Sequence, residues 1–427
     1  MNNFRKQGAH IHNFEAKVLN PAITTQLDCG IPVYLIKNNS IDISQIDFIF
    51  DAGIQYQQKK LVPHHCLPMM REGSKKHNAA DIASILEHHA VCTESLMNRK
   101  TAGMGFYIQR KFISEVLPVI TNFMFSPSFP QQELDIFNKN MHQRMKIENE
   151  KVKVMAAKRI AAKIYGEKHP MGMVIEPDDV FSLSAGDLIQ YHNARYHHGN
   201  CRLVISGFYD DALLTELNNA IKPYVSSNSI DDQFSIAEPK SEAETKFEYL
   251  HKQGATQAAI RMGKLIDMGT KSDYHLLKVL NTLLGGYFGS RLMKNIREDK
   301  GYTYGIGSAV QWFGGKALFN IMAEVNSDVW KDAVEEINKE IYNLHNGTIP
   351  FDELNMVKKT MLGDILGMFD GAYASARVLK SLMEAEQDYS FLEATIEAIH
   401  TADEYSLQQL AKKYLKPEDL FVVVAGA

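Results

Sequence analysis

Residues 201–207 read Cys201-Arg202-Leu203-Val204-Ile205-Ser206-Gly207, and a similar stretch, Leu420-Phe421-Val422-Val423-Val424-Ala425-Gly426, stands near the C-terminus. Both are short apolar runs that end in glycine, a pattern that favours buried β-strands. Each run follows a segment of helical character, which begins near Leu183 in one case and near Tyr405 in the other. The two units lie about half of the 427-residue chain apart. A helix-then-strand unit that recurs at half-length indicates two homologous halves, not an array of short repeats.

A polar stretch between the two units marks a boundary. It contains Ser226-Ser227-Asn228-Ser229, Asp231-Asp232-Gln233 and Glu238-Pro239-Lys240-Ser241-Glu242. Because runs of Ser, Asp and Glu of this length are typical of linkers, we predict an N-terminal domain over residues 1–225, a linker over 226–242 and a C-terminal domain over 243–427.

Local patterns predict the elements of each half. We expect strands at 31–37, 46–53, 103–108 and 257–263, and helices over 79–88, 112–124, 131–165 and 272–284. Pro118 should start or kink the second of these helices. In the last helix, Ser272 and Asp273 are expected to form the N-terminal cap, and Gly285 and Gly286 to end it.

Composition excludes several classes of protein. Lys and Arg number 46 against 51 Asp and Glu, so a formal charge of −5 offers no basic excess for nucleic acid. The four cysteines lie far apart without a Cys-x-x-Cys pair, which argues against a zinc ribbon or a disulfide framework. Residues 1–10 lack the apolar run of a signal peptide, and no run of about 18 apolar residues occurs. We therefore expect a cytoplasmic protein that does not bind membranes, or a periplasmic one if a leader has been removed.

The main candidate site is Arg297-Glu298-Asp299-Lys300-Gly301-Tyr302-Thr303-Tyr304, which follows the glycine-rich segment 284–292. Ser290 is a good N-cap and apolar residues follow it at helical spacing, so Arg297 should project from the last turns of a short helix that Gly301 ends. Tyr304 then opens a strand, so Arg297 and Tyr304 can converge across the corner. A guanidinium and a phenol supply several donors to a peptide carbonyl. The alternative interpretation is a surface arginine near a core tyrosine.

Several features together resemble the pitrilysin (M16) metallopeptidases, the family that includes insulinase and the mitochondrial processing peptidase. They are the two similar halves, the Leu284-Gly285-Gly286 and Ser290-Arg291-Leu292 landmarks, and an Arg and a Tyr seven residues apart with a Gly between them. Further landmarks are Glu72-Gly73-Ser74-Lys75-Lys76, His169-Pro170-Met171-Gly172 and Arg195-Tyr196, so the likeness covers nearly the whole chain. The resemblance implies an α+β fold of two homologous domains, each an antiparallel β-sheet backed by α-helices.

The zinc motif of this family is degenerate in the chain. In active members the histidines of His-x-x-Glu-His bind zinc, its Glu is the general base, and a distal Glu completes the site. Counting back from Gly73 places this motif on His64-His65-Cys66-Leu67-Pro68, where Leu67 replaces the base and Pro68 replaces the second ligand. The distal Glu should fall near Gln143 and Arg144. A catalytic zinc needs three protein ligands and an open position for water, so we expect this chain to bind no zinc or other cofactor.

Other clusters of Cys and His offer a weaker case for a metal. His64, His65 and Cys66 form one cluster, and His88, His89 and Cys92 form another, in which helical spacing would place His88 and Cys92 on one face. Neither cluster has a complete four-ligand pattern, so ordinary core or surface roles are preferred.

The resemblance also implies a role for the retained pair. In pitrilysin-like peptidases the equivalent Arg and Tyr reach toward the substrate, and in heterodimeric members the subunit without zinc ligands can supply them. We therefore expect a non-catalytic subunit, inactive alone, whose Arg297 and Tyr304 bind a peptide substrate in a heterodimer with a zinc-bearing M16 subunit. The alternative is a structural or scaffolding subunit of a larger complex, similar to the pitrilysin-like core subunits of respiratory complexes.

Overall fold

The computed structural model describes residues 21–38, 40–225, 238–241 and 243–427. Most of the predicted linker, positions 226–237 and 242, lies outside the described residues. The strands before this gap are β1 (Ile23–Gln26), β2 (Pro32–Lys37), β3 (Ile43–Phe50), β4 (Cys92–Met97), β5 (Ala102–Gln109) and β6 (Cys201–Gly207). The helices are α1 (Val62–Met69), α2 (Ala79–His88), α3 (Ile113–Phe125), α4 (Gln131–Asn149), α5 (Val152–Tyr165), α6 (Ala185–Arg195) and α7 (Asp211–Ile221).

The second half contains a matching set of elements. Its strands are β7 (Phe247–His251), β8 (Gln257–Asp267), β9 (Thr303–Phe313), β10 (Lys316–Asn326) and β11 (Phe421–Gly426). Its helices are α8 (Lys271–Asn281), α9 (Trp330–Asn346), α10 (Phe351–Met368), α11 (Ala372–Glu384), α12 (Tyr389–Thr401) and α13 (Glu404–Tyr414), with π-helical turns at Thr282–Gly286 and Met293–Asp299. The two repeated sequence units are thus α6 with β6 and α13 with β11.

Each half has one sheet, and the two sheets share a topology. The strand orders are β1-β2-β6-β3-β5-β4 and β7-β11-β8-β10-β9. Strands β2, β6, β3, β5 and β4 of the first sheet correspond in order to β7, β11, β8, β10 and β9 of the second. In each sheet one pair is parallel, β6 with β2 and β11 with β7, and the other neighbouring pairs are antiparallel. This confirms the expected α+β fold with two similar sheets, and it adds one parallel pair to each. The outermost strands β4 and β9 occupy equivalent edges.

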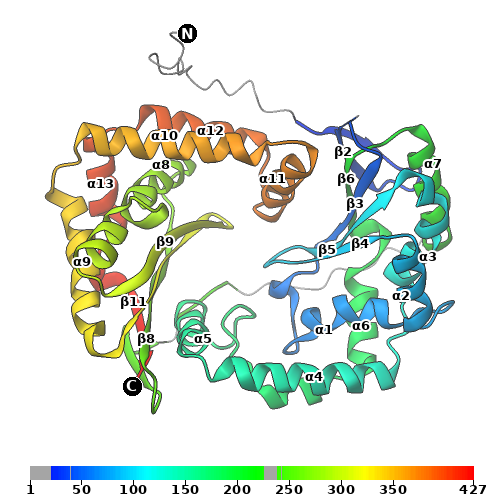
Figure 1. Ribbon diagram of the computed structural model, residues 1–427, viewed down its shortest axis with the longest axis horizontal. Helices are drawn as coiled ribbons and strands as arrows, with labels where there is room; N and C mark the ends of the chain where they lie inside the picture. The colour runs from blue at the N-terminus through cyan, green and yellow to red at the C-terminus, as the bar shows by residue number, and fades with distance from the viewer. Residues whose placement is uncertain (1–20, 39, 226–237, 242) are drawn as a thin grey trace, which may run out of the picture.

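Each half lends a helix to the sheet of the other half (Figure 1). Helix α11 packs Ala376 and Leu379 against Val204 of β6, on the face of the first sheet that its own helices leave uncovered. In the reverse direction, α5 places Ala156 against Val423 of the second sheet. The halves are therefore joined by two apolar contacts of the same kind, in addition to the separate core that fills each half.

This exchange explains why the predicted helix over 131–165 is wrong as a single element. The helix is broken at Glu150 and Lys151, because Lys151 has an extended backbone (φ −83°, ψ 123°). Helix α4 covers the first half, whereas α5 turns away to reach the second sheet. The charge pattern of the segment is helical throughout, so the sequence alone does not indicate the change of direction.

Three other local predictions need correction. Helix α3 begins at Ile113, so Pro118 lies inside it, and of its two expected roles the one of starting the helix is excluded. Helix α8 begins at Lys271 and is capped by Thr270, whose hydroxyl accepts a hydrogen bond from the backbone N–H of Asp273 at 3.1 Å. Gly286 is the last helical residue, as expected, but Gly285 lies within the π-helical continuation of the helix, where a Cβ atom would come within 2.8 Å of the backbone nitrogen of Ser308. Close packing against β9 is therefore the reason for that glycine.

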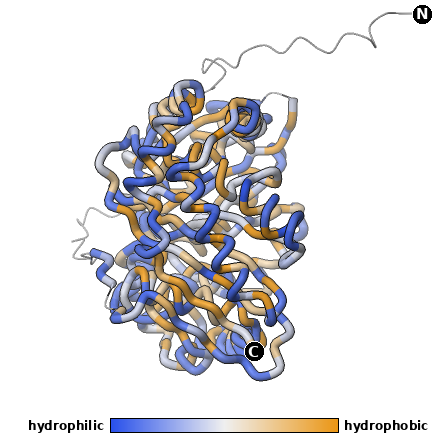
Figure 2. Tube along the Cα trace, turned by 90° about the vertical axis from the view of Figure 1, so that its left-hand side faces the viewer, coloured by the Kyte–Doolittle hydropathy of each residue, from blue (hydrophilic) through white to orange (hydrophobic). Residues whose placement is uncertain are grey.

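Hydrophobic and hydrophilic residues alternate along the elements (Figure 2). Within the described ranges, no helix combines the length and the apolar character needed to cross a bilayer.

Candidate functional site

Helix α1 carries residues 64–68, where the sequence places the degenerate zinc motif. Leu61 precedes it with a left-handed backbone (φ 68°), and Pro63 lies in its first turn. Leu67, at the position of the catalytic base, is 1% exposed and belongs to the apolar core of the first half. Pro68 has no N–H to donate to the carbonyl of His64, yet α1 continues to Met69 before it tightens into a 3₁₀ turn. The position that would hold a general base is thus part of the core.

His65, and not His64, connects α1 with α4. Its Nδ1 lies 3.1 Å from the carbonyl oxygen of Leu61, and its Nε2 lies 3.1 Å from the amide oxygen of Asn138 on α4. Burial lowers the pKa of His65 to about 4, so its ring is neutral at physiological pH. Sequence reasoning missed Asn138 because it looked for a carboxylate. The available signal is that Asn138 interrupts the apolar stripe of α4 beside Leu134 and Phe137.

The other expected metal positions do not come together. Gln143 and Arg144 lie exposed on α4. His88 ends α2 while Cys92 opens β4, so the expectation that one helical face carries both is wrong. Among the residues that the structure describes, no three His, Cys, Asp or Glu side chains are grouped so that they could hold a metal ion. The residues present at the degenerate motif therefore do not fit a catalytic zinc.

The Arg297 corner is a π-helical segment followed by a strand. Ile296 is buried and anchors the segment, and its carbonyl accepts a hydrogen bond from the N–H of Tyr302 at 3.0 Å. Gly301 has φ +67° and turns the chain into β9. Ser290 does not act as the expected cap, because it is 1% exposed and its hydroxyl has no hydrogen-bond partner among the described residues.

The two side chains of the candidate pair differ in their surroundings. The Arg297 guanidinium lies over the ring of Phe288, 4.4 Å from its centroid, and Phe288 is itself 65% exposed. Tyr304 is 94% exposed, so hardly any of its side chain is covered by other residues, Arg297 included. Arg297 is half-buried, and among the described residues no hydrogen bond or cation–π contact joins it to Tyr304.

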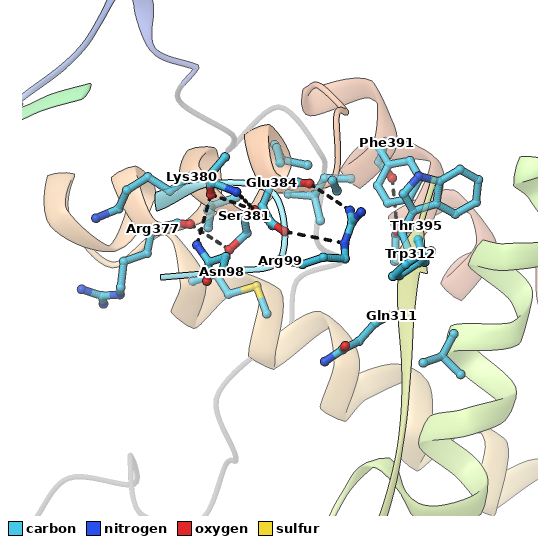
Figure 3. Close-up of a pocket in the computed structure, with 18 of the residues that line it drawn as sticks. Asn98, Arg99, Gln311, Trp312, Arg377, Lys380, Ser381, Glu384, Phe391 and Thr395 are labelled. Carbon is cyan, nitrogen blue, oxygen red and sulfur yellow. Dashed lines mark hydrogen bonds and ion pairs between the residues drawn. The ribbon is translucent and has the colours of Figure 1, made fainter. Parts of the chain in front are cut away.

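A separate cavity of about 1150 Å³ lies between the two halves (Figure 3). Its lining includes β9 from Val310 to Phe313, the opposite end of the strand from Tyr304, and it does not include Arg297. Residues of β4, α8, α10, α11 and α12 also contribute to its walls. This cavity is therefore distinct from the corner that the sequence singled out.

One loop fastens the halves beside this cavity. Glu384, at the end of α11, accepts hydrogen bonds from the backbone N–H groups of Lys100 at 2.9 Å and Thr101 at 2.7 Å. Arg99 lies 3.8 Å from the Glu384 carboxylate and 4.4 Å above the ring of Phe313. The loop between β4 and β5 thus contacts both a helix and a strand of the second half.

Comparisons with known proteins agree with this architecture. Residues 182–361 match the family model described as Peptidase M16 inactive domain. From Bacillus subtilis, the uncharacterized zinc protease YmxG is 20% identical over 79% of this chain and 82% of its own length, and the probable inactive metalloprotease YmfF is 20% identical over 82% and 86%. The crystal structure of a peptidase M16 inactive domain from Pseudomonas fluorescens superposes with a TM-score of 0.81 at 18% identity, covering 95% of this chain and 98% of that one. The names of the two Bacillus subtilis relatives differ on activity. The names of both relatives and of the Pseudomonas fluorescens structure refer to a protease, a metalloprotease or a peptidase domain.

The resemblance drawn from the sequence is therefore confirmed. Residues 182–361 match a Peptidase M16 inactive domain, and over most of its length the chain is similar in sequence or fold to the relatives named above.

Proposed function

We propose that this chain is the non-catalytic subunit of a two-chain M16 endopeptidase and that it supplies Arg297 and Tyr304 to a zinc-bearing partner. The observation that carries the proposal is the exposure of Tyr304, which is 94% exposed on the strand that follows the half-buried Arg297. A tyrosine that contributes so little to its own fold is available for a ligand outside the chain. A core tyrosine, the alternative interpretation, would be covered.

The chemistry of the corner suits a peptide carbonyl. The guanidinium of Arg297 is permanently charged and presents several N–H donors, and it makes a cation–π contact with the ring of Phe288. The phenol of Tyr304, the second residue of β9, adds an O–H donor. Donors of this kind stabilise negative charge that develops on a carbonyl oxygen, and removing one such donor costs about 2.7–4 kcal/mol in characterised enzymes.

The degenerate motif supports the other part of the proposal. Leu67 fills the core of the first half and cannot abstract a proton, so hydrolysis would depend on residues of another chain. The candidate partner is a chain of similar length, from the same organism, with an intact His-x-x-Glu-His motif. We expect the purified protein alone to contain no stoichiometric zinc in metal analysis and to cleave no peptide.

Mixing tests the pairing. The two purified chains should form a complex of one copy each in analytical ultracentrifugation, and the mixture should cleave peptides that neither chain cleaves alone. A scaffold without a proteolytic role is the rival proposal. It predicts a stable complex whose peptidase activity equals that of the partner alone.

A further inference from the structure

The cavity between the halves has an aromatic end. The rings of Tyr274 (α8), Trp312 (β9) and Phe391 (α12) lie with centroids 5.0–5.5 Å apart. Tyr274 is buried, whereas Trp312 and Phe391 are half-buried, so part of their surface faces the space. Figure 3 shows Trp312 and Phe391 side by side, across the cavity from Arg377 and Lys380. This wall offers apolar contact to the body of a ligand.

Beside this wall lies a cation without a counter-ion. Lys278 is one helical turn beyond Tyr274 on α8 and therefore on the same face of the helix, and it lines the cavity. Within the described part of the chain no carboxylate lies within 4.0 Å of its ammonium group. Lys278 is half-buried, and burial lowers its pKa with no neighbouring carboxylate acting against the shift.

None of the carboxylates that line the cavity forms an ion pair with Lys278 among the described residues. Glu384 binds the loop that carries Arg99, and Glu94 lies 4.0 Å from Lys380. Asp364 is exposed on α10. A half-buried ammonium with no partner is costly, and an anion that entered the cavity would relieve that cost.

From this juxtaposition we propose that the cavity binds an amphipathic organic anion, with an apolar body on the Tyr274, Trp312 and Phe391 wall and a carboxylate on Lys278. The volume of about 1150 Å³ accommodates a small-molecule ligand. Since the walls come from β4 of one half and β9 of the other, the ligand would also hold the halves together. This site is separate from the Arg297 corner, so the proposal stands or fails independently of the peptidase role.

Trp312 provides the measurement. The sequence has two tryptophans, and the other one, Trp330, stacks on Tyr249 at 5.2 Å and does not line the cavity. In a Trp330→Phe background, titration with decanoate should give a saturable change in Trp312 fluorescence. Lys278→Met should weaken the affinity by roughly tenfold or more, because a charge-assisted hydrogen bond is lost, whereas Lys278→Arg should retain it within a few-fold. Decanoate should also raise the melting temperature of the wild-type chain.

Two controls separate this site from general surfactant binding. Decanol has the same chain without the carboxylate and should bind at least about tenfold more weakly to the wild-type protein, a comparison that needs no folded variant. Lys359→Met removes an exposed lysine of α10 and should leave decanoate binding unchanged. The proposal is overturned if decanoate gives no saturable response up to about 1 mM, if decanol binds equally well, or if Lys278→Met binds decanoate like the wild type.

Discussion

Lys380 of α11 forms a 2.9 Å ion pair with Asp47 of β3, so a charge from each half meets at the interface between them. Asp47 is fully buried, and its carboxylate also accepts hydrogen bonds from the amide of Gln45 at 3.1 and 3.2 Å. A Cβ atom at Gly105 on the neighbouring strand would come within 2.1 Å of the same carboxylate. The first sheet therefore leaves room for one buried anion, and the second half supplies its cation.

Removing that cation should destabilise the protein. Lys380→Met leaves Asp47 buried without its ionic partner, so we expect the free energy of unfolding to fall by about 3–5 kcal/mol in urea denaturation. Arg377→Met is the matched control, since Arg377 is exposed on the same helix and has no ion pair among the described residues. Equal stability of the two variants would show that the pair does not join the halves.

The same carboxylate should make stability depend on pH. Burial, the largest effect, raises the pKa of Asp47 above its ordinary 3.8, and Lys380 opposes this shift. At pH values between 3.8 and the raised pKa, the Asp47 carboxyl is protonated in the native state but not in the unfolded state. The contribution of Asp47 to stability is therefore full below pH 3.8 and declines as the pH rises through the folded pKa. Asp47→Asn should remove this decline from the plot of unfolding free energy against pH, whereas Asn at the exposed Asp364 should not.

Leu67 offers a test of the lost zinc motif. Restoring the family's acidic residue with Leu67→Glu would place an unpaired charge in the core of the first half. We expect a loss of at least about 3 kcal/mol in unfolding free energy, against less than about 1.5 kcal/mol for the volume-conserving Leu67→Met. If calorimetry finds the two variants equally stable, the position is not committed to the core.

Glu384 should control the mobility of the loop between β4 and β5. Glu384→Ala removes the acceptor for the N–H groups of Lys100 and Thr101, which we expect to cost about 2 kcal/mol of local stability. Hydrogen exchange at these two amides should become faster by roughly thirtyfold, the rate ratio that corresponds to this energy. Glu393→Ala, at an exposed site on α12, should leave their exchange unchanged.

Much of the fold could be predicted because it depends on local pattern and repetition. The runs ending at Gly207 and Gly426 became β6 and β11, and the helix expected over 79–88 became α2 with the same bounds. The exchange of α5 and α11 could not be predicted, because it depends on which sheet face each half leaves open. No periodicity in the sequence encodes that choice.

For the candidate site, the course of the backbone could be predicted from the sequence, but the orientation of the side chains could not. The turn at Gly301 follows from its left-handed backbone. Whether Arg297 would point toward Tyr304 or lie over Phe288 depends on the π-helical geometry, which the sequence does not reveal. Lys278 was missed for a similar reason, since its lack of a partner appears only once the cavity is assembled.

The central claim is tested most directly by the kcat/KM of the reconstituted pair carrying Arg297→Ala. Lys294→Ala is the control, because Lys294 is exposed on the same π-helical segment, and Tyr304→Phe can be compared with Tyr405→Phe in the same way. We predict that Arg297→Ala lowers kcat/KM by about 10²–10³ while complex formation and melting temperature stay unchanged. A kcat/KM for Arg297→Ala equal to that of Lys294→Ala would contradict the proposal that this chain contributes to catalysis.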